Sequence, residues 1–113
     1  MKEIKAIIRD HRLDAVLSAL HTHPDLPGVT VSVVEGFGRT VGRLDETDDG
    51  PAQFGTVQMV KVECIVNDEQ LDSVIELIQQ AAHTGQPGDG KIAVYDVRET
   101  VQIRTGRRGV RVD

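Results

Sequence analysis

Three short segments of the sequence combine glycine with basic residues, a pairing that suits the binding of anions. The first, Thr84–Lys91, reads TGQPGDGK. Its glycines free the backbone so that N–H groups can point at an anion, and the lysine adds positive charge. The same composition is typical of a tight turn, so the segment is either a turn or an anion-binding nest. It is not a Walker motif, because its spacing differs and it leads from a predicted helix into a strand.

The other two segments bring guanidinium groups beside flexible backbone. Residues 36–39 read Gly-Phe-Gly-Arg, and the C-terminal tail holds Arg104, Arg107, Arg108 and Arg111. In a chain of net charge -5 these arginines indicate either a local anion site or a solvated basic tail. The acidic balance, with a pI near 5.3, argues against general nucleic-acid binding.

Composition limits the way in which a ligand can be held. Aromatic residues make up only 3% of the chain and there is no Trp, so neither a stacking platform nor an aromatic cage is expected. Backbone, aliphatic and charged groups must hold the ligand. The single cysteine, Cys64, cannot form an internal disulfide or a thiolate-rich zinc site, and we expect it to face the core.

The elements that position these segments follow from hydrophobic periodicity. Alternation over residues 1–8 predicts a strand, and apolar residues at helical spacing over 13–20 predict a helix. A β-branched run at 29–34 predicts a second strand. The first third of the chain therefore reads strand, helix, strand.

The same pattern returns after a long interruption. A strand is predicted at 57–66, a helix at 71–82 with Asn67 or Asp68 as its cap, and a strand at 91–97. Val101 to Ile103 should form a short extended tail. Residues 38–56, rich in glycine and acidic residues, fit neither period and are either a partner-binding loop or a flexible insertion.

Two strand-helix-strand units predict an α+β, ferredoxin-like βαββαβ sandwich, with a long loop of about residues 38–56 between strands 2 and 3 and a tail of about residues 104–113. We expect one domain over residues 1–113. Both helices then lie on one face of the sheet, and another copy of the chain is the natural cover for the other face. No apolar run is long enough to span a bilayer, and the amino end is charged, so a cytoplasmic protein with no direct membrane insertion is expected.

The three segments, at these separations, closely resemble those of the P-II nitrogen regulatory proteins. The residues that carry the resemblance are Gly36-Phe37-Gly38-Arg39, Thr84-Gly85 with Gly88 to Ile92, and Ile103 to Gly106. Any one of these motifs is weak evidence, but three in register over nearly the whole chain are specific.

The resemblance implies a non-enzymatic homotrimer with clefts between its subunits. Each cleft would bind an adenine nucleotide as effector, ATP, ADP or AMP, with or without Mg. The long loop would dock onto a membrane transporter or a regulated enzyme. By position, one subunit would supply Ile7, Gly36, Phe37, Gly38, Arg39, Gly88, Asp89, Gly90 and Lys91. Across the interface, Thr30, Glu63, Cys64 and Ile65 would meet the base and ribose, and Arg104 the phosphates.

Four positions depart from the family pattern. Thr40 and Met59 replace a Gln and a Lys that support 2-oxoglutarate, so sensing of that ligand is expected to be lost. Gln102 replaces one of two tail arginines, which lowers the expected advantage of ATP over ADP or AMP. Ala52 stands where some relatives carry a tyrosine that is uridylylated.

The alternative hypothesis is a metal-binding or metal-handling protein, motivated by His21 and His23 together with His11, His83 and the acidic loop. Spacing fixes no third ligand for a metal, and we name no metal site. No nucleophile and base pair can be placed from the sequence, so an enzyme is not expected.

Overall fold

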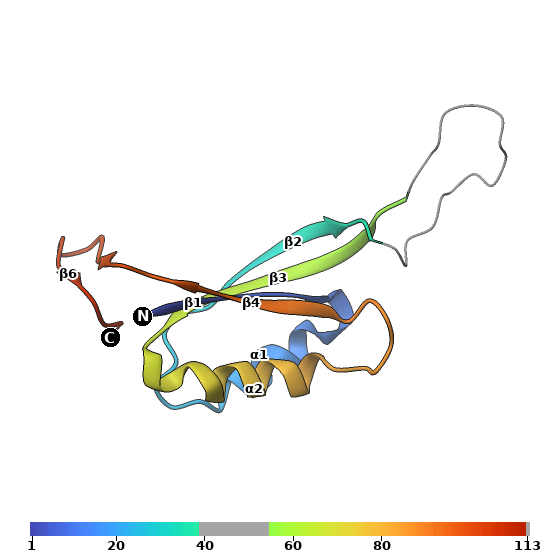
Figure 1. The fold of residues 1–113 in the computed structure, drawn as a ribbon, viewed down its shortest axis with the longest axis horizontal. Coiled ribbons are helices and arrows are strands. Elements are labelled where there is room, and N and C mark those ends of the chain that lie inside the picture. The colour runs from blue at the N-terminus through green and yellow to red at the C-terminus, as the bar shows by residue number, and fades with distance from the viewer. Residues whose placement is uncertain (39–54, 113) are drawn as a thin grey trace, which may run out of the picture.

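The computed structural model of the protein describes residues 1–38 and 55–112, and its main elements follow the order βαββαβ (Figure 1). They are β1 (Lys2–Arg9), α1 (Leu13–His21), β2 (Thr30–Gly36), β3 (Val57–Val66), α2 (Leu71–Ala82) and β4 (Gly90–Asp96). Two 3-10 turns, η1 (Asp10–Arg12) and η2 (Asp68–Gln70), lead into the helices. The predicted order of elements is confirmed.

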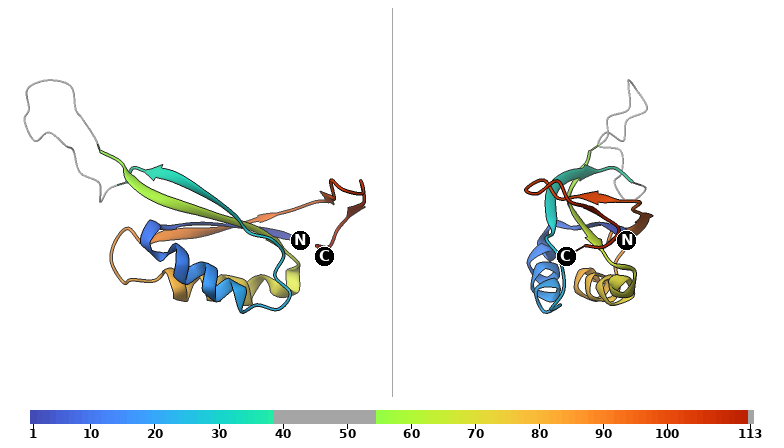
Figure 2. Two further views of the ribbon diagram at one scale, coloured as in Figure 1. Left: turned by 180° about the vertical axis from the view of Figure 1, so that it is seen from behind. Right: turned by 90° about the vertical axis from the view of Figure 1, so that its left-hand side faces the viewer.

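The four long strands form one sheet in the order β2-β3-β1-β4, and every neighbouring pair is antiparallel. β1 lies in the middle, where Lys5 stands opposite Glu63 on one side and Ala93 on the other. Both helices cover a single face of this sheet (Figure 2). This arrangement is the ferredoxin-like sandwich that the sequence predicts.

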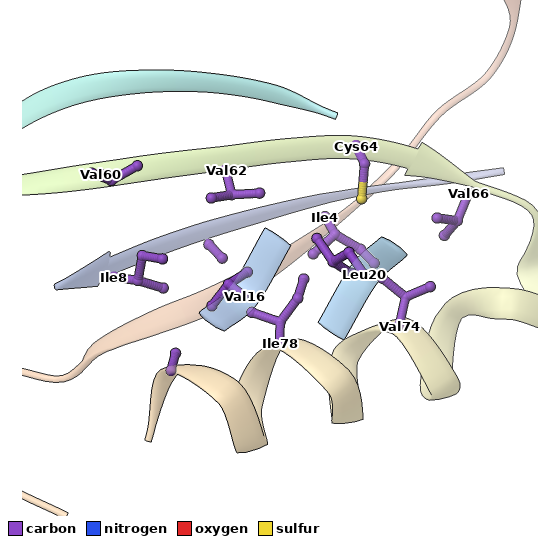
Figure 3. Packing of buried hydrophobic residues seen from close by; sticks show 12 residues of the cluster. Ile4, Ile8, Val16, Leu20, Val60, Val62, Cys64, Val66, Val74 and Ile78 are labelled. Carbon is purple, nitrogen blue, oxygen red and sulfur yellow. The ribbon is translucent and has the colours of Figure 1, made fainter. Parts of the chain in front are cut away.

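The core lies between the sheet and the two helices (Figure 3). Strand alternation sends every second side chain of β1 and β3 towards the helices, where it is removed from water. Each helix packs one apolar face against these side chains. The buried residues are Ile4, Ala6, Ile8, Val16, Leu20, Val60, Val62, Cys64, Val66, Val74, Ile78 and Ala82.

The other face of the sheet mixes charged and apolar side chains, and no described element covers it (Figure 2). Lys5 lies 4.9 Å from the centroid of the Tyr95 ring, and Lys61 Nζ lies 3.5 Å from Glu63 Oε1. On the helix side of the sheet, the β2 edge is not fully covered by the helices. Val33 pairs with Val60 and so faces the helices, yet it is 65% exposed. Val31, on the same strand and the same side, is also exposed, so the β2 edge carries a small apolar surface.

The start of α2 differs from the prediction. Its N-cap is Gln70, which makes no side-chain cap bond, because η2 precedes the helix. Of the two predicted caps, Asn67 is the N-cap of η2, which runs directly into α2, and it forms a capping box with Gln70; the cap therefore stands one turn before α2 itself. Asn67 stands at the start of η2, where its backbone N–H donates to Gln70 Oε1 at 2.8 Å. Its side chain also binds the C-terminal tail.

The tail is more ordered than a short extended segment. β5 (Thr100–Val101) pairs antiparallel with β6 (Arg108–Gly109). The connection is closed by Gln102 N–H donating to the Arg107 carbonyl at 2.8 Å and by Gly106 N–H donating to the Gln102 carbonyl at 2.7 Å. The C-terminal end of the tail is hydrogen-bonded to the residue that precedes η2. The Asn67 side chain donates to Val112 O at 3.0 Å and accepts from Val112 N at 2.8 Å.

Most of the predicted long loop, and with it Arg39, Thr40 and Ala52, lies outside the described residues. In the part of the chain that is described, no helix is long and apolar enough to cross a membrane.

Candidate functional site

One group of predicted site residues meets at the end of the sheet where β1 ends and β4 begins. Ile7 stands opposite Lys91, and Ile8 opposite Gly90. A cavity of about 200 Å³ lies here, lined by Ile7, Asp89, Gly90 and Lys91 together with the end of α2. β2 ends on the same side, since Gly36 pairs with Val57 at the start of β3.

The glycines of the Thr84–Lys91 segment are required by its backbone. Gly85, Gly88 and Gly90 have φ values of 87°, 98° and 98°. A Cβ on Gly90 would also lie 1.7 Å from the carbonyl oxygen of Ile7, so β4 can pass this close to β1 only because Gly90 has no side chain. The backbone N–H groups of Thr84 and Gly85 converge on one carboxylate oxygen, that of Asp89, which shows that this turn can present N–H groups to an anion.

Asp89 organises this segment from within. Its carboxylate accepts hydrogen bonds at 2.9 Å each from Arg9 Nε, Thr84 N and Gly85 N, and one from Thr84 Oγ1. Arg9, followed by the Thr84 hydroxyl, holds the pKa of Asp89 well below its ordinary value. Asp89 lines the cavity, but its carboxylate is already bound by Arg9 of β1 and by Thr84 and Gly85 of the segment.

A second group of predicted site residues lies towards the other end of the sheet. Thr30 on β2 pairs with Glu63 on β3, beside a cavity of about 370 Å³ that Thr30, Glu63, Cys64, Ile65 and Val112 line with others. Along β3, the side chain of Cys64 points to the opposite face of the sheet from those of Glu63 and Ile65. Cys64 therefore faces the core, although it also borders this cavity (Figure 3). Burial, with the charge of Glu3 adding to it, raises the pKa of the Cys64 thiol to about 11.

Arg104 belongs to the β5–β6 hairpin, on the same side as this second group (Figure 1). A further cavity lies beside the hairpin, lined by β5 and β6. Ile65 lines both this cavity and the one beside Thr30 and Glu63. Two other tail arginines are paired, Arg108 with Glu99 and Arg111 with Glu69, whereas Arg104 forms no ion pair with any described residue. The side chain of Gln102 accepts from Thr105 Oγ1 at 2.6 Å and is thereby drawn into the turn.

The two groups do not meet within one protomer. Thr30 and Gly36 lie six residues apart on β2, which corresponds to about 20 Å of strand. Figure 1 shows the Gly90 segment and the tail hairpin at opposite ends of the sheet. The predicted site residues therefore form two separate groups in one chain. We call the group around Gly88–Lys91 the glycine-loop half-site and the group around Thr30, Glu63 and Ile65 the sheet-end half-site.

Three other predictions are located by the structure. Phe37 and Gly38 continue from the end of β2, and the Phe37 side chain is 60% exposed. Met59 packs close to Gly36, where a Cβ would lie 3.3 Å from Met59 Cγ, and it stands opposite Arg9. Arg9 itself was missed in the sequence, because an arginine at the end of a strand gives no sign of a partner 80 residues away.

The histidines give no support to the metal-binding alternative. His23 Nε2 lies 3.0 Å from Ser73 Oγ, which itself donates to the Gln70 carbonyl at 2.9 Å, so the imidazole joins the end of α1 to α2. Among the described residues no three His, Cys, Asp or Glu side chains are close enough together to hold a metal ion.

The described residues form a ferredoxin-like α+β domain with a cavity towards each end of its sheet. Comparison with known proteins gives its family. The model of the family "Nitrogen regulatory protein P-II" matches residues 1–107, and the chain belongs to that family. It is accordingly a signal-transduction regulator and not an enzyme.

Individual relatives match over nearly the full length. The nitrogen regulatory protein P-II of Rhodospirillum rubrum and that of Azospirillum brasilense are each 44% identical over 109 residues, which is 96% of both chains. The protein of the same name from Pasteurella multocida is 43% identical over 106 residues, or 94% of each chain.

Proposed function

We propose that the protein is a cytoplasmic homotrimer that binds an adenine nucleotide, ATP, ADP or AMP, in clefts between its subunits. Each cleft joins the glycine-loop half-site of one protomer to the sheet-end half-site and Arg104 of its neighbour. The separation of the two half-sites on one protomer is the observation that carries the proposal. The uncovered sheet face and the exposed Val33 at the sheet edge support association of the copies.

The chemistry of the half-sites fits the parts of a nucleotide. The glycine-rich backbone beside Lys91 suits phosphate oxygens, since N–H groups and an ammonium both favour negative charge. Thr30 and Glu63 offer polar atoms that suit a ribose or the edge of a base, and Ile65 offers apolar surface. Each part of the ligand would then meet the appropriate chemistry.

Calorimetric titration with ATP, ADP and AMP tests this proposal. Lys91→Ala and Arg104→Ala should each weaken nucleotide binding by about 1.5–3 kcal/mol, the range for hydrogen bonds to charged groups. Arg98→Ala, which removes an exposed arginine that we place outside the clefts, is the matched control and should bind as the unmodified protein does. Failure of the unmodified protein to bind any adenine nucleotide would overturn the proposal.

We also propose that sensing of 2-oxoglutarate is lost. Met59 brings no positive charge to a dianion, and Thr40 is too short to replace a glutamine. Two missing contacts of this kind weaken binding by roughly two to four orders of magnitude. Titration of 2-oxoglutarate into protein saturated with Mg-ATP should show no micromolar binding. The double variant Thr40→Gln, Met59→Lys should gain it.

The regulated partner, in this proposal, is a membrane transporter or an enzyme that contacts the residue 38–56 segment. Deletion of residues 45–53 should leave the trimer and nucleotide binding intact and abolish capture of the partner. Light scattering and calorimetry on the deletion variant provide the check, and loss of folding would show that the segment is structural.

A further inference from the structure

Arg9 joins the end of β1 to the glycine-rich segment through two contacts. Its Nε donates to Asp89 Oδ1 at 2.9 Å, and its Nη2 donates to the Pro87 carbonyl at 2.8 Å. The two side chains are only 26% and 24% exposed. A guanidinium that engages both a carboxylate and a carbonyl of one segment fixes the orientation of that segment better than a point charge can.

The carboxylate of Asp89 poses an electrostatic problem at this place. It is the acidic residue of the segment that we propose to bind phosphate, and a bare carboxylate there would repel the ligand. The structure surrounds it with donors: Arg9 contributes a full positive charge, and Thr84 and Gly85 contribute their N–H groups.

The net charge presented to a ligand therefore depends on Arg9. Lys91 and Asp89 alone would cancel, whereas Lys91, Asp89 and Arg9 together carry one net positive charge. All three belong to or contact the segment Thr84–Lys91, so Arg9 changes the net charge of this group from zero to plus one.

We propose that Arg9 is a positioning residue for nucleotide binding, which rests on the function proposed above. It holds the Thr84–Gly90 backbone in its nest conformation and neutralises Asp89, so that the charge of Lys91 is left for the phosphates. Asp89, in turn, acts through the segment's conformation and does not touch the ligand with its carboxylate.

The test compares ATP with adenosine in calorimetric titrations of the intact protein. Arg9→Gln should weaken ATP binding by about 10- to 100-fold, the range for loss of a charge-assisted contact. Binding of adenosine, which has no phosphate, should change by less than about threefold. A residue that merely supported the fold would weaken both ligands equally, and that result would overturn the proposal.

Two further variants separate charge from shape. The double variant Arg9→Gln, Asp89→Asn removes the bare carboxylate and should recover most of the ATP affinity that Arg9→Gln loses. Arg9→Lys restores the charge but not the contact to Pro87, so it should recover part of the loss. A double variant that binds ATP no better than Arg9→Gln would contradict neutralisation of Asp89.

Arg12→Gln is the matched control. Arg12 is a nearby arginine of the same chain segment, and it donates to the Ala81 carbonyl at the end of α2 through Nε at 2.9 Å and Nη2 at 2.6 Å, whereas Arg9 donates to Asp89. Its loss should leave the ratio of ATP to adenosine affinity unchanged. Lack of nucleotide binding by the unmodified protein would reject the proposed function. Normal binding that Arg9→Gln leaves unaltered would reject only the role of Arg9.

Discussion

Gly90 is the residue whose replacement the fold should tolerate least. Its φ is 98°, and a Cβ at this position would lie 1.7 Å from Ile7 O, which leaves no room for alanine. We expect Gly90→Ala to lower the free energy of unfolding by at least about 1–3 kcal/mol, the cost of the backbone conformation alone. Urea denaturation at fixed protein concentration measures the change.

Gly28→Ala provides the control for this substitution. No atom lies within 4 Å of a Cβ placed on Gly28, and its φ is not positive. The change in stability should stay within about 0.5 kcal/mol, as for other unconstrained surface positions. Equal effects of the two substitutions would show that the close approach of β4 to β1 does not require glycine.

The buried thiol of Cys64 should make stability depend on alkaline pH. Its pKa is raised to about 11 by burial, whereas an exposed thiol ionises near pH 8.5. Between these values the unfolded chain loses a proton that the folded protein keeps, so stability falls as pH rises through this window. The contribution is fully present below about pH 8.5, and its loss amounts to about 2–3 kcal/mol by pH 11.

The difference in unfolding free energy between the unmodified protein and Cys64→Ala isolates this group from the lysines and the tyrosine. The destabilisation caused by Cys64→Ala should shrink as the pH is raised from about 8 to about 10.5, within the window between the two pKa values. A difference that stays constant over this range would mean that the thiol titrates alike in both states.

At the scale of elements, the C-terminal tail is held by one buried amide. Asn67 is 6% exposed and both donates to and accepts from the backbone of Val112. We expect Asn67→Ala to cost about 1–3 kcal/mol, because two part-buried backbone groups lose their partner. Hydrogen exchange at the Val112 amide should rise strongly in this variant.

Glu69→Gln tests the neighbouring ion pair to Arg111 in the same way. Both side chains of that pair are more than half exposed, and exposed pairs contribute about 0–1 kcal/mol. Exchange at Val112 should therefore change little. If Glu69→Gln raised hydrogen exchange at Val112 as much as Asn67→Ala does, the Asn67 side-chain amide would not be the main contact that holds the tail.

The elements show which signals a sequence carries. The strands and helices of the βαββαβ body can be predicted from hydrophobic periodicity. Each strand is long enough to show alternating apolar residues, and each helix is long enough to show apolar residues spaced three and four apart. β5 and β6 have two residues each and cannot show one. The extra 3-10 turn before α2 was likewise missed, since Asn67 carries a cap signal for either kind of helix.

The candidate site divides along the same line. The positive φ values of Gly85, Gly88 and Gly90 are local and can be inferred from the segment TGQPGDGK, whereas the close approach of Gly90 to the Ile7 carbonyl cannot. The Arg9–Asp89 contact joins residues 80 positions apart and follows only from strand pairing. The fact that the predicted site residues form two distant groups also depends on register, which fixes Ile7 opposite Lys91 and Thr30 opposite Glu63.

At the scale of the whole molecule, a site shared between protomers predicts complementation. Lys91→Ala and Arg104→Ala homotrimers should each lack a complete site. When the two variants are unfolded together in equal amounts and refolded, about one quarter of the clefts should combine an intact Lys91 with a neighbour's intact Arg104. Calorimetry of the mixture should recover that fraction of high-affinity sites. A site built within one protomer would recover none.

The position of β1 in the sheet has a consequence for how the chain is made. β1 is the first strand to be synthesised, yet one of its two partners, β4, follows 82 to 94 residues later, as the pairs Ile8–Gly90 and Lys2–Asp96 show. At 5–20 residues per second, synthesis of that interval takes roughly 4–20 s. During translation the central strand therefore keeps one edge open until nearly the whole chain has emerged from the ribosome, and a fragment that stops before Gly90 can never close it.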